Sequence, residues 1–158
     1  MKKYLFILVA MFAMSTAAFA QKGTSAVGIV GAYDDGNSQF GIGVKYQYFF
    51  IDQLRGDFGG DFFFKKDLQT LIDFNGNVHY VFPLADAINV YPMAGINFAI
   101  ASIDIAGVDN TSRLGVNLGG GFDIKISDAV KFIVEAKYII SDNGWSRFGA
   151  NAGIAFTF

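Results

Sequence analysis

Apolar side chains recur at every second position along most of this chain, and this period limits the possible folds more than any other feature. The clearest stretch is 40–48, where phenylalanine, isoleucine, valine and tyrosine alternate with glycine, lysine and glutamine. Successive side chains of a β-strand point to opposite faces, so the stretch predicts a strand with one apolar and one polar face. The 18 phenylalanines and seven tyrosines suit pleated strands.

Eight alternating stretches follow one another, at 25–33, 40–48, 54–64, 70–82, 88–100, 114–124, 130–140 and 148–158. The first is the least regular, because Val27, Ile29 and Val30 blur its two faces. Pro92 predicts a bulge or a strand boundary, since proline removes a ladder hydrogen bond. The connections alternate between short turns and mostly longer, more polar segments. This pattern predicts an all-β fold, an eight-stranded antiparallel up-and-down barrel.

The N-terminal segment carries the marks of an export signal. Lys2 and Lys3 precede an apolar run at 4–13, and an A-x-A site ends at Ala20. A transmembrane anchor would need about 20 apolar residues, more than this run supplies. We therefore expect a cleavable signal peptide at 1–20, cut between Ala20 and Gln21, and one β-barrel domain at 21–158. Export would follow the general secretory route.

The alternation leaves open which face of the barrel points inward. A lipocalin-like soluble barrel would bury its apolar face. Here aromatic residues gather near the strand ends with aliphatic residues between them, as in the girdles of a membrane barrel. The other face is rich in glycine and asparagine, which suit a narrow interior. We therefore predict a transmembrane barrel with a polar lumen network of Lys45, Arg55, Asp57, Asp61, Asp73, His79, Asp123, Lys125, Lys131, Glu135 and Lys137.

The last alternating stretch stops on an aromatic residue, Phe158, with Phe156 on the same face. A terminal phenylalanine on a final strand, in an exported chain, resembles the small outer-membrane β-barrels of Gram-negative bacteria, of the OmpX, OmpW and OmpA-barrel type. The resemblance implies outer-membrane localisation and contact with outer-membrane lipid and lipopolysaccharide. It also implies that the barrel-assembly machinery reads the last strand, with Phe156 and Phe158 as assembly signal and inner girdle. We expect a monomer.

Several chemistries are disfavoured by composition. Without the signal peptide the net charge is about −4, since 14 acidic residues face 10 basic ones, and nucleic acid requires clustered basic residues. The chain has no cysteine, and its only histidine is His79, so no metal site or cofactor is expected. Some small outer-membrane barrels modify lipid A with a histidine and a serine. His79 falls on the polar face without a serine at matching spacing, which favours a structural role and no catalytic residue.

Two features of the sequence allow more than one interpretation. The lumen charges predict either a plug of ion pairs or a path for protons or ions. Trp145, in the segment 141–147, predicts either an interfacial anchor or a contact with a partner or lipopolysaccharide. The favoured function is a non-enzymatic integral outer-membrane protein with a plugged lumen and a structural or surface-interaction role in the cell envelope. A narrow porin-like channel for small or hydrophobic solutes is the alternative, and a lipid A-modifying enzyme comes third.

Overall fold

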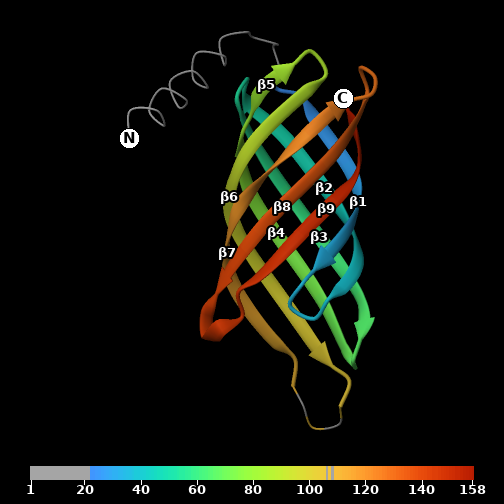
Figure 1. Cartoon of the computed structure of the whole chain (residues 1–158), viewed down its shortest axis with the longest axis vertical. Helices are drawn as coiled ribbons and strands as arrows, with labels where there is room; N and C mark the ends of the chain where they lie inside the picture. The colour runs from blue at the N-terminus through green and yellow to red at the C-terminus, as the bar shows by residue number, and fades with distance from the viewer. Residues whose placement is uncertain (1–21, 106, 108) are drawn as a thin grey trace.

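The protein is a closed antiparallel β-barrel (Figure 1). The structure, a computed structural model, describes residues 22–105, 107 and 109–158. Its strands are β1 (Ser25–Asp34), β2 (Gln39–Ile51), β3 (Leu54–Lys66), β4 (Gln69–Tyr80), β5 (Phe82–Ala85), β6 (Ile88–Ile103), β7 (Thr111–Lys125), β8 (Val130–Ser141) and β9 (Arg147–Thr157). A short 3-10 helix, η1 (Asp142–Gly144), precedes β9. Strands pair in the order β4-β3-β2-β1-β9-β8-β7-β6-β5, and β4 also pairs with β6, which closes the barrel.

The expected signal peptide at 1–20 and its cleavage site between Ala20 and Gln21 lie outside the described residues. Within the described part of the chain, no helix is both long and apolar enough to cross a membrane.

Eight strands span the barrel, as predicted, because β4 and β5 are two parts of one strand. His79 pairs with Met93 and Phe82 with Val90, so the register against β6 is unchanged across Val81. By that register Pro92 lies opposite Tyr80, where its missing N–H interrupts the ladder. The boundary expected at Pro92 therefore lies in the neighbouring strand, while β6 itself continues through the proline.

The apolar face of every spanning strand points outward, away from the barrel interior. Phe40, Ile96 and Leu114 are 68%, 66% and 69% exposed, whereas polar residues between them along the strands are buried. The structure also resolves the first strand, since Val27 and Ile29 face outward and Val30 faces inward. A surface this apolar is suited to lipid rather than water, because burying apolar area is the main favourable term in folding.

Aromatic rings pair on the outer surface near both ends of the barrel. Ring centroids lie 5.1 Å apart for Tyr33 and Phe40, and 4.8 Å apart for Tyr80 and Phe82. At the end that holds Tyr80, the backbone of Phe158 exchanges two hydrogen bonds with Ser25, at 2.9 and 3.0 Å. The first and last described strands therefore begin and finish at the same end of the barrel (Figure 1).

Glycines let neighbouring strands approach closely at particular points. A Cβ on Gly153 would lie 2.1 Å from the carbonyl oxygen of Ile29, and one on Gly119 would lie 2.2 Å from that of Ala136. The glycine-rich segments at 59–60 and 119–121 pair with both neighbours without a shift in register. They lie inside strands, and Gly119 marks tight packing rather than a kink.

Candidate functional site

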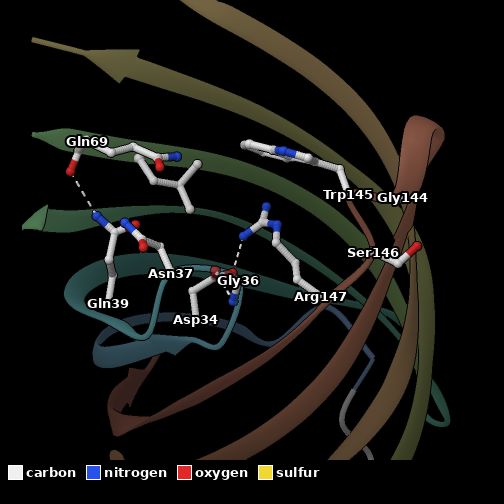
Figure 2. A pocket seen from close by; sticks show the side chains of 10 residues that line it. Asp34, Gly36, Asn37, Gln39, Gln69, Gly144, Trp145, Ser146 and Arg147 are labelled. Atoms are coloured by element: carbon white, nitrogen blue, oxygen red, sulfur yellow. Dashed lines mark hydrogen bonds and ion pairs between the residues drawn. The ribbon is translucent and has the colours of Figure 1, made fainter. Parts of the chain in front are cut away.

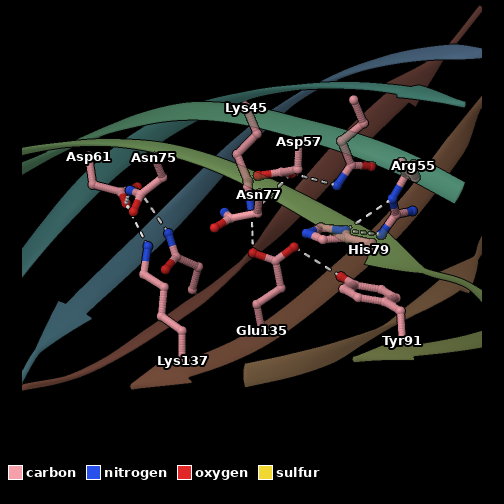
Figure 3. A network of polar contacts seen from close by, with 12 residues as sticks. Lys45, Arg55, Asp57, Asp61, Asn75, Asn77, His79, Tyr91, Glu135 and Lys137 are labelled. Carbon is pink, nitrogen blue, oxygen red and sulfur yellow. Dashed lines mark hydrogen bonds and ion pairs between the residues drawn. The ribbon is translucent and has the colours of Figure 1, made fainter. Parts of the chain in front are cut away.

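Charged and amide side chains fill the inside of the barrel (Figure 3). The strand period places them there, since most of them alternate along a strand with residues that face outward. Among the described residues, six carboxylates and five cationic side chains with at most 12% exposure lie within it, which is close to charge balance, as buried charges require. They are Asp34, Asp57, Asp61, Asp73, Asp123 and Glu135, with Lys45, Arg55, Lys131, Lys137 and Arg147.

One group of contacts joins β2, β3, β6 and β8 around Lys45. Its ammonium group is ion-paired with Glu135 and lies 3.3 Å from Oδ2 of Asp57. Tyr91 donates its hydroxyl proton to Oε1 of Glu135 at 3.0 Å. Lys45 is 7% exposed and Asp57 is fully buried, so one buried cation is shared between two buried carboxylates.

Arg55 holds the adjacent group, nearer the end of the barrel that carries Ser25 and Phe158. Its Nη1 donates to Oδ2 of Asp123 at 2.5 Å, and its Nε and Nη2 lie 3.2 and 3.0 Å from Nδ1 of His79. The guanidinium lies 4.4 Å from the ring centroid of Tyr91, on which His79 also stacks at 4.6 Å. Since arginine only donates, Nδ1 of His79 accepts and its proton sits on Nε2. Lys131 completes the group, 3.6 Å from Asp123.

Three of these residues could in principle hold a metal ion. Ligand atoms of Asp57, His79 and Glu135 all lie within 4.8 Å of one another. The ammonium of Lys45 already contacts both carboxylates, and the tautomer that Arg55 imposes protonates the free nitrogen of His79. Metal ligation needs that nitrogen deprotonated. The arrangement therefore favours a resident ammonium over a metal ion.

Amides cross-link the middle of the lumen. Asn117 donates from Nδ2 to Oδ1 of Asn75 and of Asn77, at 3.0 and 2.8 Å, and Asn97 donates to Asn75 at 3.0 Å. Asn75 in turn donates to Asp61 at 3.2 Å. The carboxylate of Asp61 also meets two side chains from the opposite wall, Asn151 and Lys137.

At the mouth of the lumen opposite to Ser25 and Phe158, several polar side chains bind to Arg147, which was expected in a connection. Its Nη2 donates to both carboxylate oxygens of Asp73 at 2.8 Å and to Oδ1 of Asn97 at 3.2 Å, while Nη1 pairs with Asp34. Asp34 was likewise assigned to a connection. The signal for both was present, because Arg147 is four residues from Asn151 and keeps its parity, and Asp34 alternates with Tyr33.

Trp145 does not stand at an exposed loop tip, as the interpretation as an interfacial anchor requires. It is half-buried and folds into the mouth of the barrel, where it packs against a cluster that includes Phe63 and Leu71. The guanidinium carbons of Arg113 and Arg147 lie 5.3 and 5.9 Å from its ring centroid. An indole held in this way covers the lumen instead of anchoring the loop in an interface.

A cavity lies at each mouth. The cavity under Trp145 has a volume of about 200 Å³ and is formed by the connections before β2 and β9 (Figure 2). The cavity at the other end has a volume of about 370 Å³ and is lined mainly by polar residues. Those with charged or amide side chains are Asp86, Asn89, Asp123, Lys125, Asp128 and Lys131.

Of the predicted lumen residues, Lys125 lies outside the buried network, because its strand β7 ends there at the rim. Lys125 is 53% exposed at the rim and pairs with Asp128 at 2.8 Å. The hydrogen bond and charge of Lys125 hold the pKa of Asp128 below its usual value. Phe156 and Phe158 are 56% and 74% exposed on the outer surface, toward the end where β1 begins. All other predicted lumen residues lie in the buried network.

The comparisons agree with this architecture. The family described as "Outer membrane protein beta-barrel domain" matches residues 5–158. No curated protein matches the chain significantly. The N-terminal β-barrel domain of Pseudomonas aeruginosa OprF is similar, with a TM-score of 0.68, 14% identity, and coverage of 87% of this chain and 98% of that one.

Two further solved structures share the fold. Neisserial surface protein A gives a TM-score of 0.66 at 16% identity, over 85% of this chain and 95% of that one. Ail, the attachment invasion locus protein of Yersinia pestis, gives a TM-score of 0.63 at 16% identity, over 87% and 99%. At such identities the likeness is one of fold.

Proposed function

Because this chain belongs to the outer-membrane protein β-barrel domain family, we propose that it is a non-enzymatic barrel whose lumen is plugged. The observation that carries the proposal is the ion-paired network between the two mouths. Lys45, Arg55 and Arg147 each contact carboxylates on other strands, at three successive levels along the barrel. Moving an ion through such a network requires breaking buried pairs, which is costly.

The orientation follows from the connections. Short turns join the strands at the end that holds both Ser25 and Phe158, and outer-membrane barrels place such turns in the periplasm. The connections at 35–38, 67–68, 104–110 and 142–146 then face the cell exterior. Export by the general secretory route and recognition of Phe156 and Phe158 by the barrel-assembly machinery belong to the same proposal.

The role in the envelope is structural or one of surface interaction, with the protein as a monomer. The outward apolar face supports contact with outer-membrane lipid and lipopolysaccharide. Two of the similar folds are named as a surface protein and as an attachment invasion locus protein. Those names describe the other proteins, and for this chain a surface contact would have to be made by its own outer connections.

Conductance in planar bilayers tests the plug. The wild-type protein should give no current steps, whereas the double variant Lys45→Ala, Glu135→Ala should give steps because it removes one buried pair entirely. Steps in the wild type that disappear with Gly121→Phe would overturn the plug and support the channel, since a Cβ at Gly121 would lie 2.9 Å from the Tyr91 hydroxyl inside the lumen.

An acyl-chain release assay on lipid A tests the enzyme alternative. His79 is fully buried inside the barrel, away from the outward apolar face. We expect no release by the wild type. Release that is lost in His79→Ala would overturn the non-enzymatic proposal.

A further inference from the structure

The cavity at the outer mouth contains buried polar atoms that the protein leaves without partners. Gln39 is 1% exposed and donates from Nε2 to the carbonyl oxygens of Phe64 and Gln69, at 3.1 and 2.9 Å. Its Oε1 has no hydrogen-bond partner among the described residues, nor has Nε of Arg147, which is 4% exposed. Both side chains line the cavity. A buried polar group without a hydrogen-bond partner costs free energy. A ligand that forms hydrogen bonds with these two atoms would recover that cost.

The chemistry of that ligand follows from the two atoms. Gln39 Oε1 is an acceptor and Arg147 Nε–H is a donor, and a hydroxyl group satisfies either. Among the described residues that line the cavity, the cationic one is Arg147, whose charge is already balanced by Asp34 and Asp73, so this lining offers no free cation to a phosphate or carboxylate. A cationic ligand would meet the guanidinium. The ligand should therefore be neutral and carry several hydroxyl groups.

The remaining lining fits the same class. Gln69 and Asn37 add amides, and Trp145 and Leu71 add apolar surface. Figure 2 shows the indole of Trp145 beside the Arg147 guanidinium, with the Gln69 side chain extending toward the ring. A volume of about 200 Å³ is below the 300–1,000 Å³ of sites for drug-sized ligands. It has room for about six waters at ~30 Å³ each, or for one small ring.

We infer that the cavity bounded by Gln39, Trp145 and Arg147 binds one neutral polyhydroxylated ring, a free monosaccharide or the terminal sugar of a glycan. The inference deepens the proposed surface-interaction role and rests on it for the exposure of this mouth to the cell exterior. The ring hydroxyls accept from Arg147 Nε and donate to Gln39 Oε1, and an apolar ring face packs toward Trp145. Amides with one aromatic ring give orientation without net charge.

Trp145 is the single tryptophan of the chain, so its fluorescence reports directly on the cavity. Folded protein in detergent micelles is titrated with glucose, galactose and N-acetylglucosamine, with inorganic phosphate as the charged comparison. At least one sugar should change the Trp145 emission saturably, with matching heat in calorimetry, and phosphate should not. If no sugar does so, or if phosphate does so instead, the inference is wrong.

Variants locate the binding. Gln39→Leu should weaken it about tenfold, the equivalent of one hydrogen bond, and Asn37→Ala provides a loop variant in case Gln39→Leu does not fold. Asn89 lines the cavity at the opposite mouth, so Asn89→Leu should leave sugar binding unchanged. Binding that is equal in all variants would overturn the assignment, as would a structure of the sugar-soaked protein with ordered water only at Gln39 Oε1 and Arg147 Nε.

A second comparison distinguishes a free monosaccharide from the terminal sugar of a glycan. Methyl β-glycosides and disaccharides that retain the affinity indicate a glycan terminus, whereas loss of affinity indicates a free monosaccharide. Because binding in micelles does not depend on a closed lumen, a conducting wild type that binds sugar refutes the plug alone. A non-conducting protein that binds no sugar refutes this inference alone.

Discussion

Arg147 reaches across the barrel to Asp73 and donates to both of its carboxylate oxygens at 2.8 Å. The two residues lie on β9 and β4, which are four strands apart in either direction around the closed order of eight. The pair therefore spans the diameter of the lumen at the mouth that Trp145 covers. Arg147 also pairs with Asp34 on the adjacent strand β1, so one guanidinium ties three strands together.

Arg147→Met should lower the free energy of unfolding by about 3–5 kcal/mol, because it leaves two buried carboxylates without their cation. Urea unfolding in lipid vesicles measures the loss. Lys65→Met is the matched control, since it removes an exposed pair with Asp104 and should cost far less stability. Equal losses in the two variants would contradict the structural role of Arg147.

Val116→Lys should cost about 2–4 kcal/mol, because Val116 is on the outward face near the middle of β7 and would place an ammonium in hydrocarbon. Ile105→Lys is the control, since Ile105 is also an exposed aliphatic residue but lies in the connection between β6 and β7. Its cost should be close to zero. Urea unfolding in lipid compares them, and the outward facing is wrong if both variants are equally stable.

Gly153→Ala should destabilise the barrel by about 1–3 kcal/mol, because the new Cβ would lie 2.6 Å from the Cα of Val30 on the neighbouring strand. Gly31→Ala, at the same interface between β1 and β9, has its nearest atom at 3.7 Å and should be neutral or slightly stabilising. Thermal and urea unfolding of the pair give the difference. If Gly153→Ala were as stable as the wild type, β1 and β9 would separate more easily than their register implies.

The outer pair of Asp104 and Lys65 should respond to acid. The hydrogen bond and charge of Lys65 hold the pKa of the Asp104 carboxyl below its usual value. A lowered folded pKa means that the pairing is present above the usual value and is lost as the pH falls through the folded one. A carboxyl NMR titration should show the pKa of Asp104 rising in Lys65→Met. An identical titration in both proteins would show that the ion pair does not form in solution.

The eight strands and the outward apolar face could be read from the sequence, whereas several strand ends could not. The alternation in segments such as 40–48 is local, and a strand turns successive side chains to opposite faces whatever its neighbours are. The same parity places Lys45, Asp57 and His79 inside, and it would have placed Asp34 and Arg147 there too. Those two were missed only because they stand at the ends of strands, beside the connections.

The tertiary structure alone decided which groups meet. Arg147 and Asp73 are 74 residues apart in the chain, and the stagger of eight strands brings them to one level. That stagger also brings the Arg55 guanidinium to Nδ1 of His79 and so fixes the histidine tautomer. The sequence pattern could not have specified that tautomer. Trp145 turns inward because Leu71, Arg113 and Arg147 converge under it at the mouth. The alternation of side chains along a strand fixes which face of the barrel each residue occupies. Its contact partners depend on the closure of the barrel and on the register between strands, and neither is encoded within a single strand.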